Sequence, residues 1–491
     1  MSRRSAAALA ATFLAAPLLA QAPAEGPPRG FPLEVREFAG PDRVGHPIGL
    51  SVDDRGRVWV AETRRYTVGV RQSRGDGELE DLELRVRTFA EFEEVLREQV
   101  RAGKFRRDDD KENDAAEFCF HDGLSEEVVR YEDPDGDGRA DRRVVFADGF
   151  DRWSTGPAAD VLVDGDRVWL ANVPDLWRLV DRDGDGRATG DEKEVVATGF
   201  GVVLSFLGHD MHGLVRGMDG RLYWSVGDRS FHVETDDGRT FAGKTGAVFR
   251  MNPDGTGLEP FAVGLRNPQD LAFTALGDLW TGDNNCDKGD RARIVHVPFG
   301  SDHGWRLSVQ RADSGGPWLR EKTWWTTGRI AERIGARREA AVHRSPIRPA
   351  SVLPPLHHPL GQGPSGAFPY PGTGLPERYD DHQFLTHCAG GGGFVQAFRL
   401  APDGASLRVE DFHVFLEPDR IVGPSDAEFG PDGRIHATNW GSGWDPNEDA
   451  SLMTVAHPPS LAHPRVAEVR RLLGEGFSHR PDDALATLLG P

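Results

Sequence analysis

The chain has 491 residues, of which 38% are hydrophobic and 28% charged, a composition typical of soluble globular proteins. Its formal net charge of -20 argues against nucleic acid or an anionic membrane surface as a binding partner. The high content of glycine (59) and proline (34) suits many short strands joined by turns.

The first 22 residues have the pattern of a secretory signal peptide. Arg3 and Arg4 supply the positive start, an Ala/Leu-rich run supplies the apolar core, and Ala20-Gln21-Ala22 is a small-x-small cleavage site. The apolar run is too short to favour a membrane anchor, and no other segment of the sequence predicts a transmembrane helix. We therefore expect export to the periplasm or beyond, by a Sec or a Tat route, with residues 23–39 as a linker.

One phrase recurs along the chain and predicts a β-hairpin: an alternating apolar strand, an Asp/Gly turn and a second strand of aromatic or β-branched residues. The copies are GHPIGLSVDDRGRVWVAE from 45, GPAADVLVDGDRVWLAN from 156, HGLVRGMDGRLYWSVGD from 212, NPQDLAFTALGDLWTGD from 267, the weaker GPSGAFPYPGTGLPERYDDHQFLTHC from 363, and GPSDAEFGPDGRIHATNW from 423. Hairpins that recur every ~40 residues or more are typical of propeller blades. The sequence therefore predicts an all-β, six-bladed β-propeller over residues 40–458, and a β-sandwich array is the weaker alternative.

Three segments lie outside this repeat. Residues 74–118 are charged and predicted to be partly helical, and residues 306–350 are Arg-rich and predicted to form a second, partly helical insertion. Residues 459–491 predict a short helical tail, since four apolar residues share one helical face: Val466, Val469, Leu472 and Leu473.

Two acidic loops have the spacing of calcium ligands. The first, DRDGDGRATGDE, matches D-x-D-x-D-G-x5-E in full, through Asp181, Asp183, Asp185, Gly186 and Glu192. The second, DPDGDGRAD, repeats only the front half of the pattern, through Asp133, Asp135, Asp137 and Asp141, with Val144 at the closing position. Carboxylates supply the hard oxygen ligands that Ca²⁺ prefers, so we predict structural calcium at the first loop. The alternative for both loops is an acidic turn between the outer strands of a blade.

The stretch HDMHGLVRGMDGRLYWSVGD places two histidines before a strand that ends on an aspartate. A neutral imidazole, of His209 or of His212, can accept the proton of a hydroxyl group. The carboxylate of Asp228 would fix the tautomer of that base and stabilise the imidazolium that forms. Either histidine can equally hydrogen-bond backbone or water at a channel mouth.

Three further motifs resemble a known family. GLRNPQDLAF at 264–273, DNNCDKGD at 283–290 and SDHGW at 301–305 resemble the soluble quinoprotein glucose/sorbosone dehydrogenase propellers. The chain looks still closer to the "membrane-bound dehydrogenase" propellers of exported planctomycete and verrucomicrobial proteins, over roughly residues 40–455. The resemblance implies an oxidoreductase that transfers hydride from a sugar or polyol to pyrroloquinoline quinone (PQQ), with a calcium ion polarising the quinone.

The resemblance also implies roles for individual residues. It places His209 at the position of the base, with His212 as the near alternative, and Asp228 at the position of its partner. Arg266 and Asn267 would lie against the cofactor or a developing oxyanion, with Gln269 nearby. The remaining implied positions are Arg420, before the last blade, and a calcium loop from Asp283 to Asp290. The alternative for Arg266-Asn267-Pro268 is a turn-forming role.

The sequence also departs from this family. The stretch FLTHCAGGGG at 384–393 lacks the lysine that pairs with a cofactor carboxylate, and each such charge-assisted contact contributes about 1.5–3 kcal/mol. No haem-attachment motif is present, so electrons would pass to a separate acceptor. The alternative function is a non-catalytic propeller that binds carbohydrate or a protein. A propeller hydrolase is a third possibility, and it would gather Glu62, Asn284 and Asp426 around a calcium ion.

Overall fold

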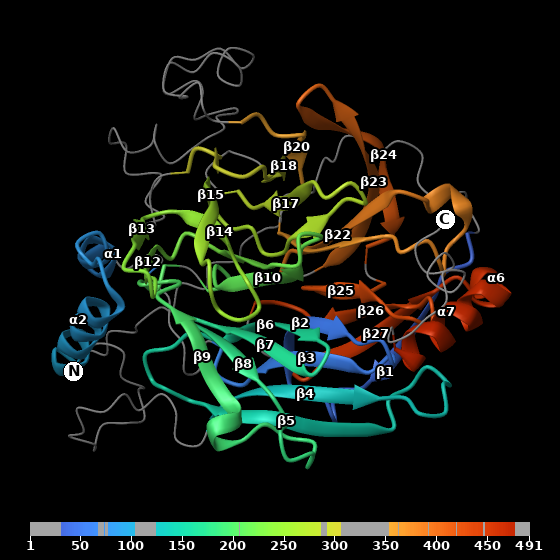
Figure 1. The fold of residues 1–491 in the computed structure, drawn as a ribbon, viewed down its shortest axis with the longest axis horizontal. Coiled ribbons are helices and arrows are strands. Elements are labelled where there is room, and N and C mark those ends of the chain that lie inside the picture. The colour runs from blue at the N-terminus through green and yellow to red at the C-terminus, as the bar shows by residue number, and fades with distance from the viewer. Residues whose placement is uncertain are drawn as a thin grey trace, which may run out of the picture.

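Six β-sheets follow one another along the chain and form the six blades of a β-propeller (Figure 1). The structure, a computed structural model, describes residues 31–66, 73, 77–103, 124–205, 207–285, 292–305, 353–361, 363–390, 392–418, 420–444 and 447–476. The predicted signal peptide and the predicted insertion at 306–350 lie outside these residues. The prediction of a six-bladed propeller is confirmed.

Each blade consists of four antiparallel strands in sheet order, and blade 3 carries one more. Blade 1 contains β2 (His46–Val52), β3 (Val58–Thr63), β4 (Glu126–Glu132) and β5 (Arg142–Phe150). Blade 2 contains β6 (Ala158–Asp164), β7 (Arg167–Asn172), β8 (Asp175–Leu179) and β9 (Lys193–Thr198). Blade 3 contains β10 (Met211–Arg216), β11 (Leu222–Val226), β14 (Gly246–Met251), β15 (Glu259–Leu265) and the parallel β19 (Ser301–Asp302).

The other three blades repeat this pattern. Blade 4 contains β16 (Ala272–Phe273), β17 (Leu279–Asp283), β18 (Ala292–His296) and β20 (His357–Leu360). Blade 5 contains β21 (Pro364–Pro369), β22 (His382–Cys388), β23 (Gly393–Asp403) and β24 (Ser406–Leu416). Blade 6 contains β25 (Ala427–Phe429), β26 (Ile435–Asn439), β27 (Ser451–Ala456) and β1 (Glu34–Ala39). The predicted hairpins supply the two inner strands of every blade.

The ring is closed by the first strand of the chain. β1 pairs antiparallel with β27, with Glu34 opposite Ala456, so residues from both ends of the chain share blade 6. β1 falls within residues 23–39, which the sequence predicted to be a linker. This closure leaves the sixth sheet with its full set of four strands, as in the other blades.

Aromatic side chains fill the space between neighbouring blades. Between blades 2 and 3, Trp169 and Trp224 belong to one buried cluster, and the rings of Phe200 and Trp224 meet edge to face at 5.2 Å. The second strand of blade 3 is buried at all five positions, because both faces of its sheet are covered. This explains why the second strand of this hairpin, LYWSV, carries only one side chain that is not hydrophobic.

Aspartates of the even-numbered blades join neighbouring blades at the innermost strands. Each carboxylate accepts a backbone N–H from the next blade: Asp160 from Leu214 (2.7 Å), Asp270 from Ala367 (2.6 Å) and Asp426 from Leu50 (2.7 Å). The corresponding positions in the odd-numbered blades are glycines, at 49, 213 and 366. A Cβ on Gly49 would lie 2.5 Å from the Asp160 carboxylate, so the alternation of glycine and aspartate is sterically required there.

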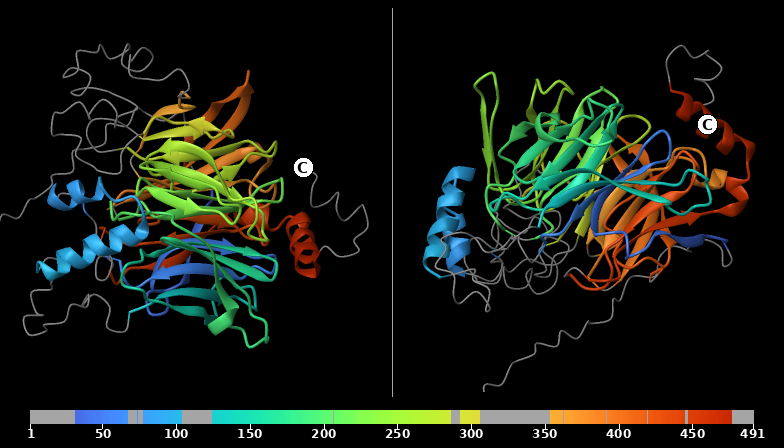
Figure 2. Two further views of the ribbon diagram at one scale, coloured as in Figure 1. Left: turned by 60° about the vertical axis from the view of Figure 1, so that its left-hand side comes forward. Right: turned by 90° about the horizontal axis from the view of Figure 1, so that it is seen from below.

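Helices lie on two sides of the blades (Figure 2). α1 (Gly77–Glu83) and α2 (Phe89–Arg101) come from the charged insertion, and their apolar residues pack against residues 202–204. α6 (Pro458–Leu461) and α7 (Pro464–Glu475) form the predicted helical tail, in which Val466 and Leu472 are buried. A separate hairpin, β12 (Phe231–Glu234) and β13 (Thr240–Gly243), extends from blade 3. Within the described ranges, no helix has the length and apolarity needed to cross a membrane.

Candidate functional site

His209 and Asp228 form a direct contact at one end of the first hairpin of blade 3. The Nδ1 atom of His209 lies 2.6 Å from Oδ1 of Asp228, and the exposed fractions of the two side chains are 1% and 0%. Their segments are held together by the N–H of Gly227, which donates to the Asp210 carbonyl at 3.0 Å. A Cβ at Gly227 would lie 2.6 Å from the His209 carbonyl oxygen, so glycine is required for this approach. The structure thus brings together the imidazole and carboxylate that the sequence predicted as partners.

Two further residues donate hydrogen bonds to Asp228. The indole N–H of Trp305 donates to Oδ2 at 3.0 Å, and the hydroxyl of Ser205 donates to Oδ1 at 3.3 Å. Ser205 and Ser230 both have left-handed backbone conformations, with φ of 47° and 64°, and such strain is often concentrated at functional sites. These hydrogen bonds fix the orientation of the Asp228 carboxylate.

A buried ion pair holds the same two segments in place. The guanidinium of Arg229 donates through Nη1 to Oδ1 of Asp210, and through Nε to the Val203 carbonyl at 3.0 Å. Both charged side chains are almost completely buried. Because Asp210 follows His209 and Arg229 follows Asp228, the ion pair lies next to the imidazole–carboxylate pair and fixes its geometry.

Arg266 approaches His209 from the turn that leads into blade 4. Both its backbone N–H and that of Asn267 donate to Oδ1 of Asp283 at 2.9 Å, while Arg293 donates to Oδ2 at 2.7 Å. The guanidinium carbon of Arg266 lies 5.7 Å from the centroid of the Trp305 ring. Burial and the positive charge of Arg266 lower the pKa of His209, against the opposing effect of Asp228. His209 is therefore neutral near pH 7, as a general base must be.

Asn267 and Gln269 contact the backbone immediately before His209. Their amide N–H groups donate to the Gly208 carbonyl at 3.1 and 2.9 Å. The side-chain oxygens of these two amides have different partners. That of Gln269 accepts from the Ser365 hydroxyl at 2.7 Å, whereas Oδ1 of Asn267 is buried without a hydrogen bond to any described residue. Through these two hydrogen bonds to Gly208, the turn holds the backbone next to His209 in position.

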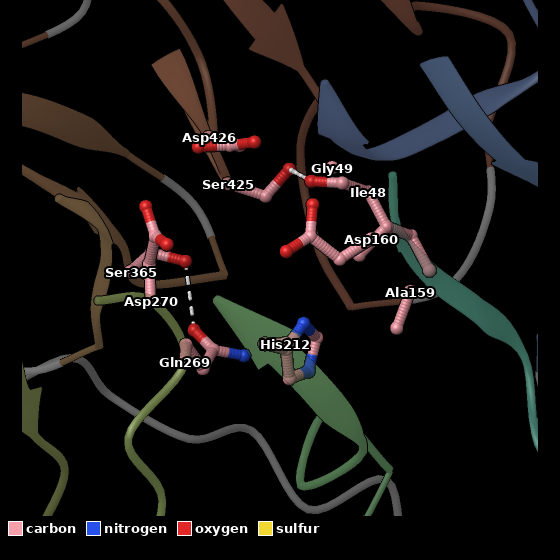
Figure 3. Close-up of a pocket in the computed structure, with 10 residues that line it drawn as sticks. All are labelled: Ile48, Gly49, Ala159, Asp160, His212, Gln269, Asp270, Ser365, Ser425 and Asp426. Atoms are coloured by element: carbon pink, nitrogen blue, oxygen red, sulfur yellow. Dashed lines mark hydrogen bonds between the residues drawn. The ribbon is translucent and has the colours of Figure 1, made fainter. Parts of the chain in front are cut away.

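His212 lies in a different environment, a small central cavity (Figure 3). The cavity is also lined by the three aspartates that join the blades. Burial and the charges of the other aspartates raise the pKa values of Asp160 and Asp270, and burial with the charge of Glu428 raises the pKa of Asp426 to about 8. Burial lowers the pKa of His212 to about 4. The Ala159 and Gly208 carbonyls lie near the ring, but Nε2 makes no hydrogen bond to a described residue. Of the two histidines, His209 is the one with a carboxylate partner.

Other predicted residues lie apart from His209 or have partners of their own. Arg420 is exposed and donates to the Leu33 carbonyl at 3.2 Å. Asp283 holds the Arg266 turn, and residues 286–290 of the predicted calcium loop lie outside the described part of the chain. Buried Glu62 accepts hydrogen bonds from Tyr131 and Arg143, so its environment is that of a structural carboxylate.

Blade 5 supplies a histidine in the stretch without lysine. The Nε2 atom of His387 lies 2.7 Å from the amide oxygen of Gln396, and the imidazole stacks on Phe394 with a centroid distance of 4.2 Å. His387 is fully buried, and both contacts are internal to the blade. A cofactor carboxylate would therefore find no lysine ammonium group at this strand.

The two acidic loops gather part of their predicted ligand sets. In the first, Asp181, Asp183 and Glu192 have oxygens within 4.8 Å of one another, whereas Asp185 accepts from the Arg187 N–H. Both Glu192 oxygens accept backbone N–H groups, from residues 182 and 189. In the second, Asp141 completes the group with Asp133 and Asp135, while Asp137 accepts from the Arg139 N–H.

The six blades form a β-propeller, and the buried imidazole–carboxylate pair marks a candidate active site at blade 3. The fold is that of a solved structure of a glucose dehydrogenase. The two chains share 15% sequence identity with a TM-score of 0.51, over 86% of this chain and 99% of the other. A family model described as a domain of unknown function (DUF7133) matches residues 28–442, and the chain belongs to this family.

Two other solved structures are similar at lower scores. The PQQ-bound aldose sugar dehydrogenase from Streptomyces coelicolor is 13% identical, with a TM-score of 0.47 over 88% of this chain and 99% of the other. The apo form of the soluble aldose sugar dehydrogenase from Escherichia coli is 14% identical, with a TM-score of 0.49 over 87% and 99%. At such identities the likeness concerns the fold alone. No curated protein is significantly similar to the chain.

Proposed function

We propose that the chain is an oxidoreductase that transfers hydride from a hydroxyl-bearing sugar or polyol to PQQ, with His209 as the base. The observation that carries this proposal is the 2.6 Å contact between His209 Nδ1 and Asp228. A carboxylate at Nδ1 keeps the proton there, so the basic lone pair of the ring is on Nε2. The lowered pKa of His209 keeps the ring neutral and able to accept a proton near pH 7.

The residues around His209 have complementary roles. His209 Nε2 would accept the proton of the substrate hydroxyl group while the hydride leaves the carbon atom that bears this hydroxyl. Asp228 would stabilise the imidazolium, and the N–H of Trp305 and the hydroxyl of Ser205 hold that carboxylate in position. When bound, PQQ supplies the hydride acceptor, and a calcium ion polarises its carbonyl. Electrons would then pass to a separate acceptor.

The residues present fit such a cofactor at one side. Arg266 lies beside His209, and its guanidinium would hold an anionic, oxygen-rich ring system. The Asn267 amide oxygen, which has no hydrogen bond to a described residue, would instead accept an N–H or O–H of the cofactor or ligate a cation. Two other buried arginines nearby are neutralised, Arg229 by Asp210 and Arg293 by Asp283. We therefore expect PQQ to bind with fewer charge-assisted contacts than its three carboxylates can make.

A second candidate function is a non-catalytic propeller that binds carbohydrate or a protein. The observation that favours it is burial: the exposed fractions of His209 and Asp228 are 1% and 0%, so a substrate reaches the base only if the structure opens. The neutralised arginines support the same candidate. In this case the imidazole–carboxylate pair and the ion pair beside it would stabilise blade 3.

We also propose calcium at the first acidic loop, where Asp181, Asp183 and Glu192 gather oxygen donors. To bind the ion, Glu192 would have to exchange the two backbone N–H groups that it now accepts. The loop follows β8 on the outer side of blade 2, which suits a structural ion. Export to the periplasm or beyond remains a prediction, which cell fractionation of the tagged full-length chain would test.

The test of the main proposal is dye reduction by purified protein supplied with PQQ and Ca²⁺, across a panel of sugars and polyols. We expect saturable activity that falls by about 10²–10⁴-fold in His209→Gln. The matched control is His296→Gln, because His296 also contacts a carboxylate, Asp278, but lies on blade 4. Full activity in His209→Gln would exclude it as the base, and loss in His212→Gln alone would move that role to His212. Absence of PQQ binding by calorimetry would favour the binding propeller.

A further inference from the structure

Another histidine–aspartate contact lies in blade 5, between β22 and β24, and here a second histidine joins it. His382 is the first residue of β22, and Asp411 and His413 are on β24. Their ligand atoms all lie within 4.8 Å of one another. Both imidazoles are almost completely buried, whereas the carboxylate is 52% exposed.

The sheet register explains how two strands that are not neighbours bring their side chains together. β23 lies between them, with Arg399 opposite His382 and Ala397 opposite His413, so both histidines are on the same face of the sheet. The small side chain of Ala397 leaves room above β23, and the two imidazole centroids are 5.8 Å apart. A bulge in β24 places Asp411 at a φ of 50° and turns its carboxylate towards the histidines.

Backbone carbonyls orient both rings through their Nδ1 atoms. His382 Nδ1–H donates to the Asp380 carbonyl at 3.3 Å, and His413 Nδ1–H donates to the Asp411 carbonyl at 2.7 Å. With the proton on Nδ1, the lone pair of the neutral His382 ring is on Nε2. The Nδ1 atom of His413 also lies 3.6 Å from Oδ1 of Asp411. Metal-binding histidines in proteins usually have this arrangement, in which a carbonyl or carboxylate holds the ring nitrogen that does not bind the metal.

The contact between His382 and Asp411 then places two acceptors against each other. His382 Nε2 lies 3.1 Å from Oδ2 of Asp411, and a neutral ring oriented by the Asp380 carbonyl has no proton to offer there. For this tautomer, a cation or a second ring proton between the two atoms would turn the contact into a favourable one. The separation matches that of two ligands on a tetrahedral zinc ion, about 3.3 Å for bonds of about 2.0–2.1 Å.

We propose that His382, Asp411 and His413 form a zinc site. Two imidazoles and one carboxylate are the donor set that zinc favours, whereas Ca²⁺ would require more oxygen ligands. The half-exposed side of Asp411 leaves a fourth position for water. The ion connects β22 to β24 across β23, and thereby stabilises the outer part of blade 5. This site is independent of the proposed dehydrogenase function.

The test is metal binding to the full-length chain after removal of bound metal by a chelator. We expect one equivalent of Co²⁺ to give the strong visible absorption of a tetrahedral site, and Zn²⁺ to displace it. Zn²⁺ should also raise the melting temperature, because an ion that binds only the folded state stabilises it. The spectrum should be lost in His382→Gln and in His413→Gln, and retained in His296→Gln, whose single imidazole also contacts a carboxylate.

The controls separate a metal site from an ion pair of His382 with Asp411. A histidine variant that fails to fold is replaced by Asp411→Asn, whose exposed side chain tolerates substitution; folding is checked by circular dichroism. In that variant we expect Co²⁺ affinity to fall at least tenfold. No Co²⁺ spectrum in the wild-type chain, or an equal spectrum in the wild-type chain and all three variants, would overturn the proposal.

Discussion

Two of the histidine–aspartate contacts in this propeller, those of His209 and His382, differ in the ring nitrogen that meets the carboxylate and in their surroundings. At His209 the partner Asp228 is fully buried, receives hydrogen bonds from Trp305 and Ser205, and lies near a guanidinium. At His382 the partner Asp411 is half exposed. There the neighbouring group is a second imidazole, that of His413.

The difference shows that the neighbours of a His–Asp pair decide its chemistry. At His209 the carboxylate meets Nδ1, so the other ring nitrogen carries the basic lone pair, and the nearby positive charge of Arg266 keeps the ring neutral. At His382 a carbonyl takes the Nδ1 position, so the carboxylate meets the lone pair itself. The first arrangement suits proton transfer, and the second suits a cation.

The largest expected effect is a difference in kcat between two variants, one that removes the negative charge beside His209 and one that removes the negative charge beside His382. Asp228→Asn should lower kcat of the PQQ-dependent reaction by roughly 10²–10⁴-fold, because the amide neither fixes the tautomer of His209 nor stabilises its imidazolium. Asp411→Asn should leave kcat unchanged. Steady-state dye reduction measures both variants. Equal kcat values for Asp228→Asn and the wild type would end the distinction between the two pairs.

The next effect concerns the buried ion pair that holds His209 in place. Arg229→Met leaves the buried charge of Asp210 without its partner and should lower the free energy of unfolding by about 3–5 kcal/mol. The exposed pair of Arg187 with Asp148 is the control, and Arg187→Met should cost at most about 1 kcal/mol. Urea denaturation compares the two. Similar urea midpoints for the two variants would mean that the buried pair of Arg229 with Asp210 contributes no more to stability than a surface ion pair.

A third prediction uses the central cavity, where His212 has no carboxylate partner. The pKa of Asp426 is raised to about 8 by burial and by the negative charge of Glu428. A carboxyl whose pKa is higher in the folded than in the unfolded state makes stability fall as the pH rises from about 4 to about 8. The melting temperature should follow this slope.

Two variants separate the groups that titrate in the cavity. Asp426→Asn should flatten the decrease in melting temperature above pH 4. His212 acts in the opposite sense: its pKa is lowered to about 4, so stability is lost as the pH falls from about 6.5 towards 4. His212→Gln should remove that loss at acidic pH. An unchanged slope in Asp426→Asn would show that its carboxyl is not the group that titrates.

The smallest expected effect is a shift in pH dependence. The positive charge of Arg266 lowers the pKa of His209, so Arg266→Gln should raise that pKa towards its ordinary value. Because the neutral ring is the active form, the acidic limb of kcat/KM should move to higher pH. The position of this limb is measured rather than the height of the plateau, which also reports cofactor binding. A limb that moves to lower pH would contradict the assignment of His209 as the base.

Much of the fold could be predicted because the hairpin phrase is local. The turn between β2 and β3 shows why: Gly56 has a φ of 78°, and its N–H donates to the Asp53 carbonyl at 2.8 Å. Such a turn depends on residues only a few positions apart. The pairing of β1 with β27 depends instead on strands at opposite ends of the chain, and the short EVREFA stretch carries no turn motif.

In the candidate site, too, contacts between residues close in sequence could be predicted and contacts between distant residues could not. His209 and Asp228 belong to one hairpin, so their meeting could be predicted from the sequence. Ser205 precedes that hairpin in a strained loop, and although Trp305 lies in the SDHGW motif, its bond to Asp228 spans 77 residues. Arg420 was assigned from its place in a motif alone, and its described partner is Leu33.

Glycine and aspartate alternate along the innermost strands, and this pattern is visible in the sequence. Its structural role could not be inferred without knowing which blades are neighbours. In PIGLSV, AADVLV and HGLVRG the third, third and second letters alternate between Gly and Asp. Each aspartate accepts a hydrogen bond from the next blade, so the pattern describes contacts between repeats. Only the closed ring makes the last of these contacts possible.

The placement of β1 has a consequence for how the chain reaches its folded state. β1 is synthesised first and its partner β27 roughly 400 residues later, a separation that makes this pairing among the slowest contacts to form. Until then β1 is a strand with unsatisfied backbone groups and blade 6 lacks its outer edge, a state prone to association with other chains. Joining the ends near residues 34 and 456 and opening the chain between two blades would convert this late pairing into a local hairpin, and refolding should become faster.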